Sequence, residues 1–427
     1  MATLSIGHFD KGAAPKDVNQ FFAPYHNRGG LLAPVFARNR NKFRDDDRNR
    51  WSSLKEVRGN TVTGEEVKRL QTFLYSANFM PRSNKDGIFG YVTQASVRLF
   101  QEYIRTIEKI DCKPDGIVGS KTWGHIARWE KVGLKADWGT SDEYQKWMTT
   151  LRATKKHYQE NSSPIIEMVD QFPKASDTRK LADWEFKEDD IHLVGIRVGE
   201  EVKAHNRRAN DLFVLLINGM VFKFWGSTDP SAKTAKREHE AFLVEGQHKY
   251  SFAWHSLSNA NKTYRALWPY SKPKGRGFGV MIYRDWNRDN AFDEKDIKLR
   301  ESLGRTAIDT DLNHTIHIHW SGLGYSNWSA GCQVINGNKY INNKGETVDC
   351  TAFAATTYLL RNSKGQVIRG QKGKTKGAYN VFTDLILAYA PTGKDYLLYT
   401  MGRDETLQIG EQFEDDYLEK TMKEMML

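Results

Sequence analysis

The stretch that decides the fold reads Leu212-Phe-Val-Leu-Leu-Ile217, then Asn218-Gly219, then Met220-Val-Phe-Lys-Phe-Trp225. Two apolar runs flank an Asn-Gly pair, and both residues of such a pair can take the positive φ angles of a type I′ turn. This pattern predicts a β-hairpin. Further strands are predicted over 249–254, 279–284, 315–320 and 396–400. Residues 189–408 are therefore expected to form a mainly β domain that is large enough to be a catalytic domain.

An internal repeat lies upstream of this domain. Asp86-Gly-Ile-Phe-Gly90 recurs 29 positions later as Asp115-Gly-Ile-Val-Gly119. Each Asp-Gly pair is typical of a tight turn, and each copy is followed by apolar residues at helical spacing, over 93–104 and 122–129. Residues 61–132 are therefore predicted to form a small helical domain.

The repeat, together with Val67-Lys-Arg-Leu70-Gln71, resembles the peptidoglycan-binding domain type 1 family. The resemblance implies a helical module that binds cell-wall glycan or stem peptide. The alternative is a helical bundle that uses the same turns only for packing. The candidate binding turns comprise Asp86, Gly87, Gly90, Asp115, Gly116 and Gly119.

Three further segments complete the predicted organisation, which is multidomain α+β. Residues 1–60 are expected to be a basic N-terminal arm, a solvated segment or a docking site for a partner. Residues 133–188 are expected to be a helical connector because Tyr144, Trp147, Met148 and Leu151 recur at helical spacing. Residues 409–427 are expected to be an acidic C-terminal helix.

The densest chemical signal is Thr315-Ile-His-Ile-His319-Trp, followed by Ser329-Ala-Gly-Cys332. Side chains alternate along a strand, so His317 and His319 are expected on one face. A cysteine attacks carbonyls as the thiolate, and a nearby imidazole can take its proton. Backbone N–H groups around Gly331 could face a developing oxyanion, and Ser329 could orient the imidazole. In the non-catalytic alternative, Cys332 is a buried structural thiol.

Residues 240–400 resemble the L,D-transpeptidase catalytic domain, most sharply over Ser329–Ile335. The resemblance implies that Cys332 is the nucleophile and His319 the base, with His317 the less favoured base. Ala330 and Val334 stand where that family carries His and Arg. These departures favour a thioester-forming step over cross-linking specifically. The candidate substrate groove comprises His317, His255, Trp320 and Gln333.

A polar loop precedes the histidine-bearing strand. Its oxygen-bearing side chains occupy the ligand positions of a calcium-binding loop, with an Asp in the last position, where Glu is usual. The sequence therefore predicts a possible Ca²⁺ site, and no cofactor is expected to be required. The alternative is a polar turn that binds no metal ion. The candidate ligands are Asp285, Asn287, Asp289, Asp293 and Asp296.

Composition narrows the class of protein. The 427 residues carry a net charge of +10, with 39% hydrophobic and 12% aromatic residues. This is too apolar for a disordered chain, and no run is long enough for a membrane span. The excess of positive charge favours anionic partners such as peptidoglycan, and no nucleic-acid-binding signature occurs. Three cysteines are too few for a disulfide framework.

Two functions from different classes fit these observations. The first is a peptidoglycan-binding cysteine enzyme that acts on stem peptides through a thioester, as L,D-transpeptidase or as peptidase or amidase. The second is a non-catalytic wall-binding component or effector of a phage or contractile injection apparatus, docked through the N-terminal arm. The first residues lack the pattern of a secretory signal, so action at the wall is expected to follow non-classical delivery.

Overall fold

The structure is a computed structural model, and it describes most of the chain. The described residues are 1–13, 15, 61–81, 85–138, 141–161, 163–198, 210–231, 241–257, 262–271, 278–284, 286, 294–324, 327, 329–351, 359–361, 367–372, 377–391 and 394–426. For 253–257, 262–264, 294, 359–361, 367–372 and 426 only the backbone is described.

The chain divides into two compact units. We call Met1–Trp138, Phe252–Arg265 and Ala352–Asp395 the helical unit. We call Gly139–Ser251, Ala266–Thr351 and Tyr396–Leu427 the barrel unit. The helical unit contains the predicted peptidoglycan-binding repeat, and the barrel unit contains the predicted cysteine site.

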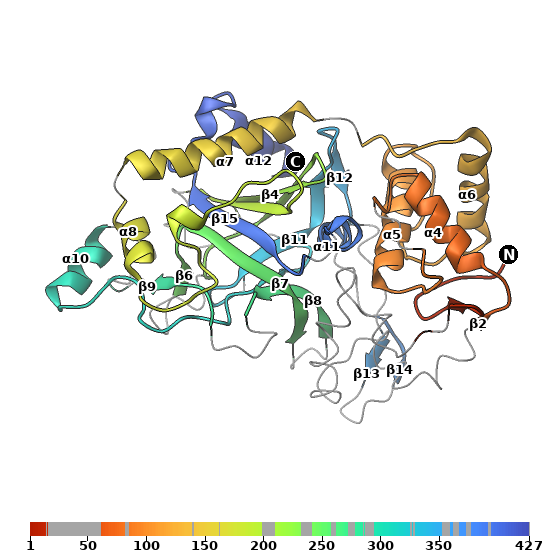
Figure 1. The fold of residues 1–427 in the computed structure, drawn as a ribbon, viewed down its shortest axis with the longest axis horizontal. Coiled ribbons are helices and arrows are strands. Elements are labelled where there is room, and N and C mark those ends of the chain that lie inside the picture. The colour runs from red at the N-terminus through yellow and green to blue at the C-terminus, as the bar shows by residue number, and fades with distance from the viewer. Residues whose placement is uncertain are drawn as a thin grey trace. The chain divides into compact units, whose positions relative to one another are not determined.

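The helical unit is built on helices α4 (Glu66–Ser76), α5 (Tyr91–Thr106) and α6 (Ser120–Val132) (Figure 1). Helices α5 and α6 were predicted from the spacing of apolar residues, and the prediction is confirmed. Their buried faces meet in an aromatic core, where the ring of Trp129 lies 5.3 Å from Phe100 and 5.7 Å from Phe79. Such edge-on and tilted contacts stabilise small cores beyond simple burial.

Each copy of the repeat is fastened by one buried glutamine. The Gln71 amide nitrogen donates to Asp86, to the Ile88 carbonyl and to Thr93, while its oxygen accepts the Gly87 N–H. The polar atoms of the turn therefore form hydrogen bonds that fix the turn against the helices. The Thr93 hydroxyl belongs to this network and does not cap the helix that follows. The second copy repeats the arrangement with Gln101, Asp115, Gly116, Ile117 and Thr122.

The first residues of the chain are part of the helical unit and not of a free arm. Leu4 pairs with Val118 in the second repeat, and Phe9 pairs with Ile88 in the first. Strand β1 (Phe9–Asp10) pairs in parallel with β2 (Thr61–Val62). The Asp10 carboxylate accepts the N–H groups of Val67 and Lys68 at the start of α4, at 2.9 Å each. The remainder of the predicted arm, 16–60, lies outside the described residues.

A fourth helix, α11 (Ala378–Tyr389), packs in the same unit. Its residues fall inside the segment expected to be mainly β, so that boundary was wrong here. The helix is held to α5 by Asp384, which forms buried ion pairs with Arg98 and Arg265 at 2.8 and 3.2 Å. The long apolar run of α11 is explained by its burial along nearly its whole length.

Most of a sheet that closes on itself lies in the barrel unit, and the ends of its strands β7 and β8 belong to the helical unit. Its strand order is β10-β8-β7-β15-β3-β4-β5-β11-β12, and β10 also pairs with β11. Eight strands therefore form a ring, and β12 extends it at one side. The strands are β3 (His192–Arg197), β4 (Asp211–Ile217), β5 (Met220–Ser227), β7 (Gly246–Leu257), β8 (Lys262–Pro269), β10 (Ile318–Trp320), β11 (Gln333–Ile341), β12 (Thr347–Asp349) and β15 (Leu397–Arg403).

The predicted hairpin is confirmed as β4 and β5. Their turn residues Asn218 and Gly219 have φ angles of 51° and 76°, as a type I′ turn requires. Both strands are buried throughout, because one face fills the barrel and the other is covered by helices. The fold class α+β with several domains is therefore correct at this level.

Helices α7 (Asp142–Glu160) and α12 (Tyr417–Met426) cover the barrel and lie side by side in Figure 1. Trp147 on α7 packs 5.0 Å from Phe413, in one apolar cluster with Val194 and Leu212 of the sheet. The segment expected to be a connector is thus part of the barrel unit from Gly139 onward. The stripe of Tyr144, Trp147, Met148 and Leu151 is core.

Smaller elements complete the description. Strands β6 (Ala241–Leu243) and β9 (Ile282–Arg284) form a two-stranded sheet, as do β13 (Leu359–Arg361) and β14 (Val367–Lys372). In the described part of the chain, no helix has the length and apolar character to span a membrane. The remaining elements are α8 (Pro164–Gln171), η3 (Leu181–Asp183), α10 (Glu294–Ser302) and η7 (Ile409–Glu411).

Candidate active site

The parallel pairing of β10 with β11 brings the predicted cysteine and histidine together. Ile318 lies opposite Gln333, and the Gln333 N–H donates to the His317 carbonyl at 2.8 Å. Cys332 immediately precedes β11. Because side chains alternate, Cys332 shares one face with His319, while Gln333 and Ile318 point to the other face.

The Cys332 sulfur lies among hydrogen-bonding groups. It interacts electrostatically with the His319 ring. The His317 N–H points at Sγ from 3.4 Å, and the Thr315 carbonyl oxygen lies 3.1 Å from it. The neutral thiol can donate to Thr315, whereas the thiolate can accept from His317 and from a protonated His319.

The second nitrogen of His319 fixes the ring. Its Nδ1 lies 2.9 Å from the Trp320 carbonyl oxygen. A carbonyl only accepts, so Nδ1 carries a proton and Nε2 is the nitrogen that can exchange a proton with the thiol.

Electrostatics favour transfer of the thiol proton to the imidazole. Burial raises the pKa of the Cys332 thiol, but the hydrogen bond and charge interaction with His319 outweigh it and bring the pKa below its ordinary value. Burial likewise lowers the pKa of His319, yet the interactions with Cys332 and Trp320 bring it above its ordinary value. These opposite shifts bring the two pKa values closer together, so the thiol proton passes to the imidazole more easily than between the isolated groups.

Gly331, before the cysteine, is required by the backbone. Its φ is +136°, and a Cβ there would lie 2.7 Å from the Ala241 carbonyl oxygen. Any side chain would therefore be strained and would push the loop away from β6.

The exposure of the residues around the sulfur is intermediate. Cys332, His319 and Trp320 are each half-buried. His317 is buried and its ring stacks on Trp268, 4.3 Å away and nearly parallel, so its backbone N–H is the part that faces the sulfur. Trp268 and the Thr315 carbonyl are brought to the site by the tertiary fold, which spacing along the chain does not indicate.

Two residues of the expected substrate groove need separate mention. Gln333 is fully buried, and its amide is bonded to Thr228 and Tyr399 in the barrel interior, so it does not line a groove. This corrects the expectation, and strand alternation is the physical reason. The side chain of His255 lies outside the described part of β7.

Most of the candidate calcium loop also lies outside the described residues, namely Asp285, Asn287, Asp289 and Asp293. Asp296 is described, fully buried in α10, and accepts the Trp286 N–H at 2.7 Å. Among the described residues, no group of His, Cys, Asp or Glu could hold a metal ion.

Comparison with known proteins identifies the helical unit. Residues 63–126 match the family described as putative peptidoglycan binding domain. A search of the curated proteins and a search of the solved structures found no match. The match supports cell-wall binding through this domain, with peptidoglycan as the partner.

Proposed function

We propose that the barrel unit is a cysteine-dependent enzyme acting on peptidoglycan stem peptides, as an L,D-transpeptidase or a peptidase. The observation that carries the proposal is the electrostatic coupling of the Cys332 thiol with His319, whose ring Nδ1 lies 2.9 Å from the Trp320 carbonyl oxygen. The resemblance of Ser329–Ile335 to the L,D-transpeptidase motif adds support.

The proposed first step is acylation. His319 Nε2 takes the thiol proton, and the Cys332 thiolate attacks a stem-peptide carbonyl carbon, forming a C–S bond and a tetrahedral oxyanion. When the oxyanion collapses, the C–N bond breaks and the imidazolium gives its proton to the leaving amine. A thioester on Cys332 remains, and His319 is neutral again.

The second step releases the acyl group. An amine or a water molecule attacks the thioester carbonyl while His319 accepts its proton. The C–S bond breaks, and the thiolate is restored beside the imidazolium. Attack by an amine gives transpeptidation, and attack by water gives hydrolysis. The peptidoglycan-binding domain would raise the local concentration of substrate for either outcome.

A digestion experiment tests the proposal. Purified sacculi would be incubated with the wild-type chain, with Cys332→Ala and with Cys112→Ala, and the muropeptides analysed by mass spectrometry. Cys112 is the matched control, because it is a buried thiol in the helical unit whose pKa burial raises to about 11. We expect wild type and Cys112→Ala to change the muropeptide profile, and Cys332→Ala to leave it unchanged.

Sacculus binding would be measured by co-sedimentation in the same samples. Retained binding with no change of profile for Cys332→Ala attributes catalysis to the sulfur. If Cys332→Ala alters the wall as wild type does, or if the wild type binds sacculi without altering them, the enzyme proposal is wrong. The second of these results favours the non-catalytic binder.

A further inference from the structure

Inside the barrel, a chain of hydrogen bonds ends at the residue that follows the proposed nucleophile, Cys332. Gln333 follows Cys332 and points inward, whereas Cys332 points outward. The Gln333 amide nitrogen donates to the Thr228 carbonyl at 2.9 Å, and its oxygen accepts the Tyr399 hydroxyl at 2.9 Å. The side chain is fully buried. Gln333 therefore contacts the interior on two sides but cannot touch a substrate.

Tyr399 reaches Gln333 from the opposite wall. Around the ring of strands, β15 and β11 are separated by the same number of strands in either direction. The tyrosine can extend across because Gly195 on β3 leaves room, since a Cβ there would lie 2.1 Å from the Tyr399 hydroxyl. The hydrogen bond thus ties two opposite sides of the barrel together.

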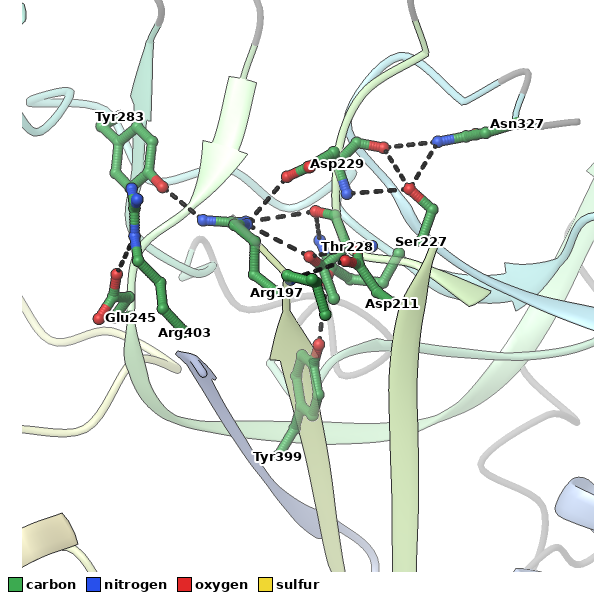
Figure 2. A network of polar contacts seen from close by, with 12 residues as sticks. Arg197, Asp211, Ser227, Thr228, Asp229, Glu245, Tyr283, Asn327, Tyr399 and Arg403 are labelled. Atoms are coloured by element: carbon green, nitrogen blue, oxygen red, sulfur yellow. Dashed lines mark hydrogen bonds and ion pairs between the residues drawn. The ribbon is translucent and has the colours of Figure 1, made fainter. Parts of the chain in front are cut away.

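Thr228 is itself firmly held (Figure 2). Its hydroxyl donates to Asp211 at 2.8 Å, and its N–H donates to the same carboxylate. Arg197 donates to the Thr228 hydroxyl and carbonyl oxygens and forms an ion pair with Asp229 at 2.9 Å. All four residues are buried, so Gln333 is anchored on a buried network of polar and charged groups.

The loop before Cys332 is fastened to the same anchor. The Asn327 side chain donates to the Ser227 hydroxyl at 3.0 Å and to the Asp229 carbonyl at 2.6 Å (Figure 2). Further along, the Ser231 N–H donates to the Ser329 carbonyl at 2.6 Å. The backbone is therefore held on both sides of the nucleophile.

The strand that carries the histidine is tied from the interior as well. The Tyr250 hydroxyl donates to the Ile316 carbonyl at 3.0 Å. Its ring packs edge-on against Tyr399, with centroids 5.7 Å apart. Tyr250, which is bonded to the segment before β10, and Tyr399, which is bonded to β11, therefore contact each other inside the barrel.

We propose that Gln333 and Tyr399 are positioning residues, which hold the Cys332 sulfur in register with the His319 ring from inside the barrel. The inference rests on the proposed function for its catalytic meaning. Its physical content, the geometry of the thiol–imidazole pair, can be measured without turnover. An apolar residue at 333 would fill the barrel equally well but could not fix the position of the strand start.

The test uses the full-length chain and the rate of Cys332 alkylation by iodoacetamide as a function of pH, followed by mass spectrometry of the Cys332 peptide. The variants are Tyr399→Phe, Gln333→Met and Tyr144→Phe. Tyr144→Phe is the matched control, because it also removes a buried tyrosine hydroxyl bond, to the Glu188 carbonyl at 3.0 Å. That bond lies in the barrel unit but does not involve the cysteine loop.

We expect Tyr399→Phe and Gln333→Met to move the midpoint of the alkylation profile upward by about one pH unit, since a looser pair stabilises the thiolate less. Tyr144→Phe should keep the wild-type midpoint of the alkylation profile, even if its melting temperature falls as much as those of the other two variants. The inference is overturned if the first two variants melt lower but keep the wild-type midpoint, or if Tyr144→Phe shifts it equally. A wild type that is inactive on sacculi would refute the proposed function, yet would leave this measurement intact.

Discussion

At the scale of single residues, two histidines that look equivalent in the sequence have different environments. Both were expected on one strand face. His317 stacks its ring on Trp268 and offers its backbone N–H to the sulfur. His319 instead offers its ring, with Nδ1 fixed by a carbonyl. His317 lies just before β10, which begins at Ile318 and contains His319.

Replacing His319 should therefore change the thiol. In the wild type, the lowered pKa of Cys332 keeps thiolate present below the ordinary thiol range, and alkylation should decline as the pH falls through that lowered pKa. With His319→Gln the profile should move to higher pH by about one unit or more. His317→Gln is the control, because it keeps the backbone N–H. Equal shifts in the two variants would contradict the assignment of His319 as the partner.

At the scale of elements, the helical unit depends on contacts between a turn and the helix before it. The same glutamine-centred network occurs in both repeats, around Gln71 and Gln101. The sequence pattern marked the turns, and the structure explains why the glutamine is part of it. The matched family over 63–126 includes both networks.

Removing one network should destabilise the unit without touching the barrel. For Gln101→Leu we expect a loss of about 1–3 kcal/mol, because Asp115 and the Gly116 N–H lose buried partners. Thermal melting and sacculus co-sedimentation would measure the effect. Gln145→Leu, at an exposed position on α7, serves as the control and should change little. Equal melting of both variants would show that the network contributes nothing.

The start of α4 provides a second prediction at this scale. The Asp10 carboxylate accepts two N–H groups of the first turn, from a segment far away in the sequence. Asp10→Ala should cost about 1 kcal/mol of stability, as loss of a helix cap usually does. Asp10→Asn can still accept a hydrogen bond and should lose less. Urea denaturation of the two variants checks this order, and a reversed order would refute the capping role.

At the scale of the whole molecule, the chain combines a wall-binding unit with a closed barrel whose interior contains charge. The Arg197–Asp229 pair and Asp211 lie buried together, near Tyr283 and Phe242. Burying ions is costly, and their mutual contacts only partly offset that cost. Such a cluster should make stability depend on pH.

Burial, followed by the charge of Asp229, raises the pKa of Asp211 from 3.8 to about 7 in the folded chain. The folded state then holds a proton that the unfolded state has lost between these values. The contribution of Asp211 is therefore largest at low pH and disappears as the pH rises through about 7. Urea denaturation at pH ~5 and ~8 should show a smaller stability difference for Asp211→Asn than for wild type. An unchanged difference would contradict the shift.

Local patterns in the sequence determined several features. The Asn218-Gly219 hairpin, the duplicated Asp-Gly turns and the helices around them follow from backbone preference and apolar spacing, which act between neighbours in the chain. The candidate site was marked by the types of residue in the motif around Cys332, a thiol preceded by two imidazoles.

Tertiary structure decided the rest. Ring closure placed β10 beside β11, chose His319 over His317 and turned Gln333 inward, because these outcomes depend on pairing between distant strands. The tertiary fold also packs Met1–Lys11 and α11 into the helical unit, and it packs α7 and α12 against the barrel. Apolar spacing shows that a helix has a face to bury, but only the folded chain supplies the surface that buries it.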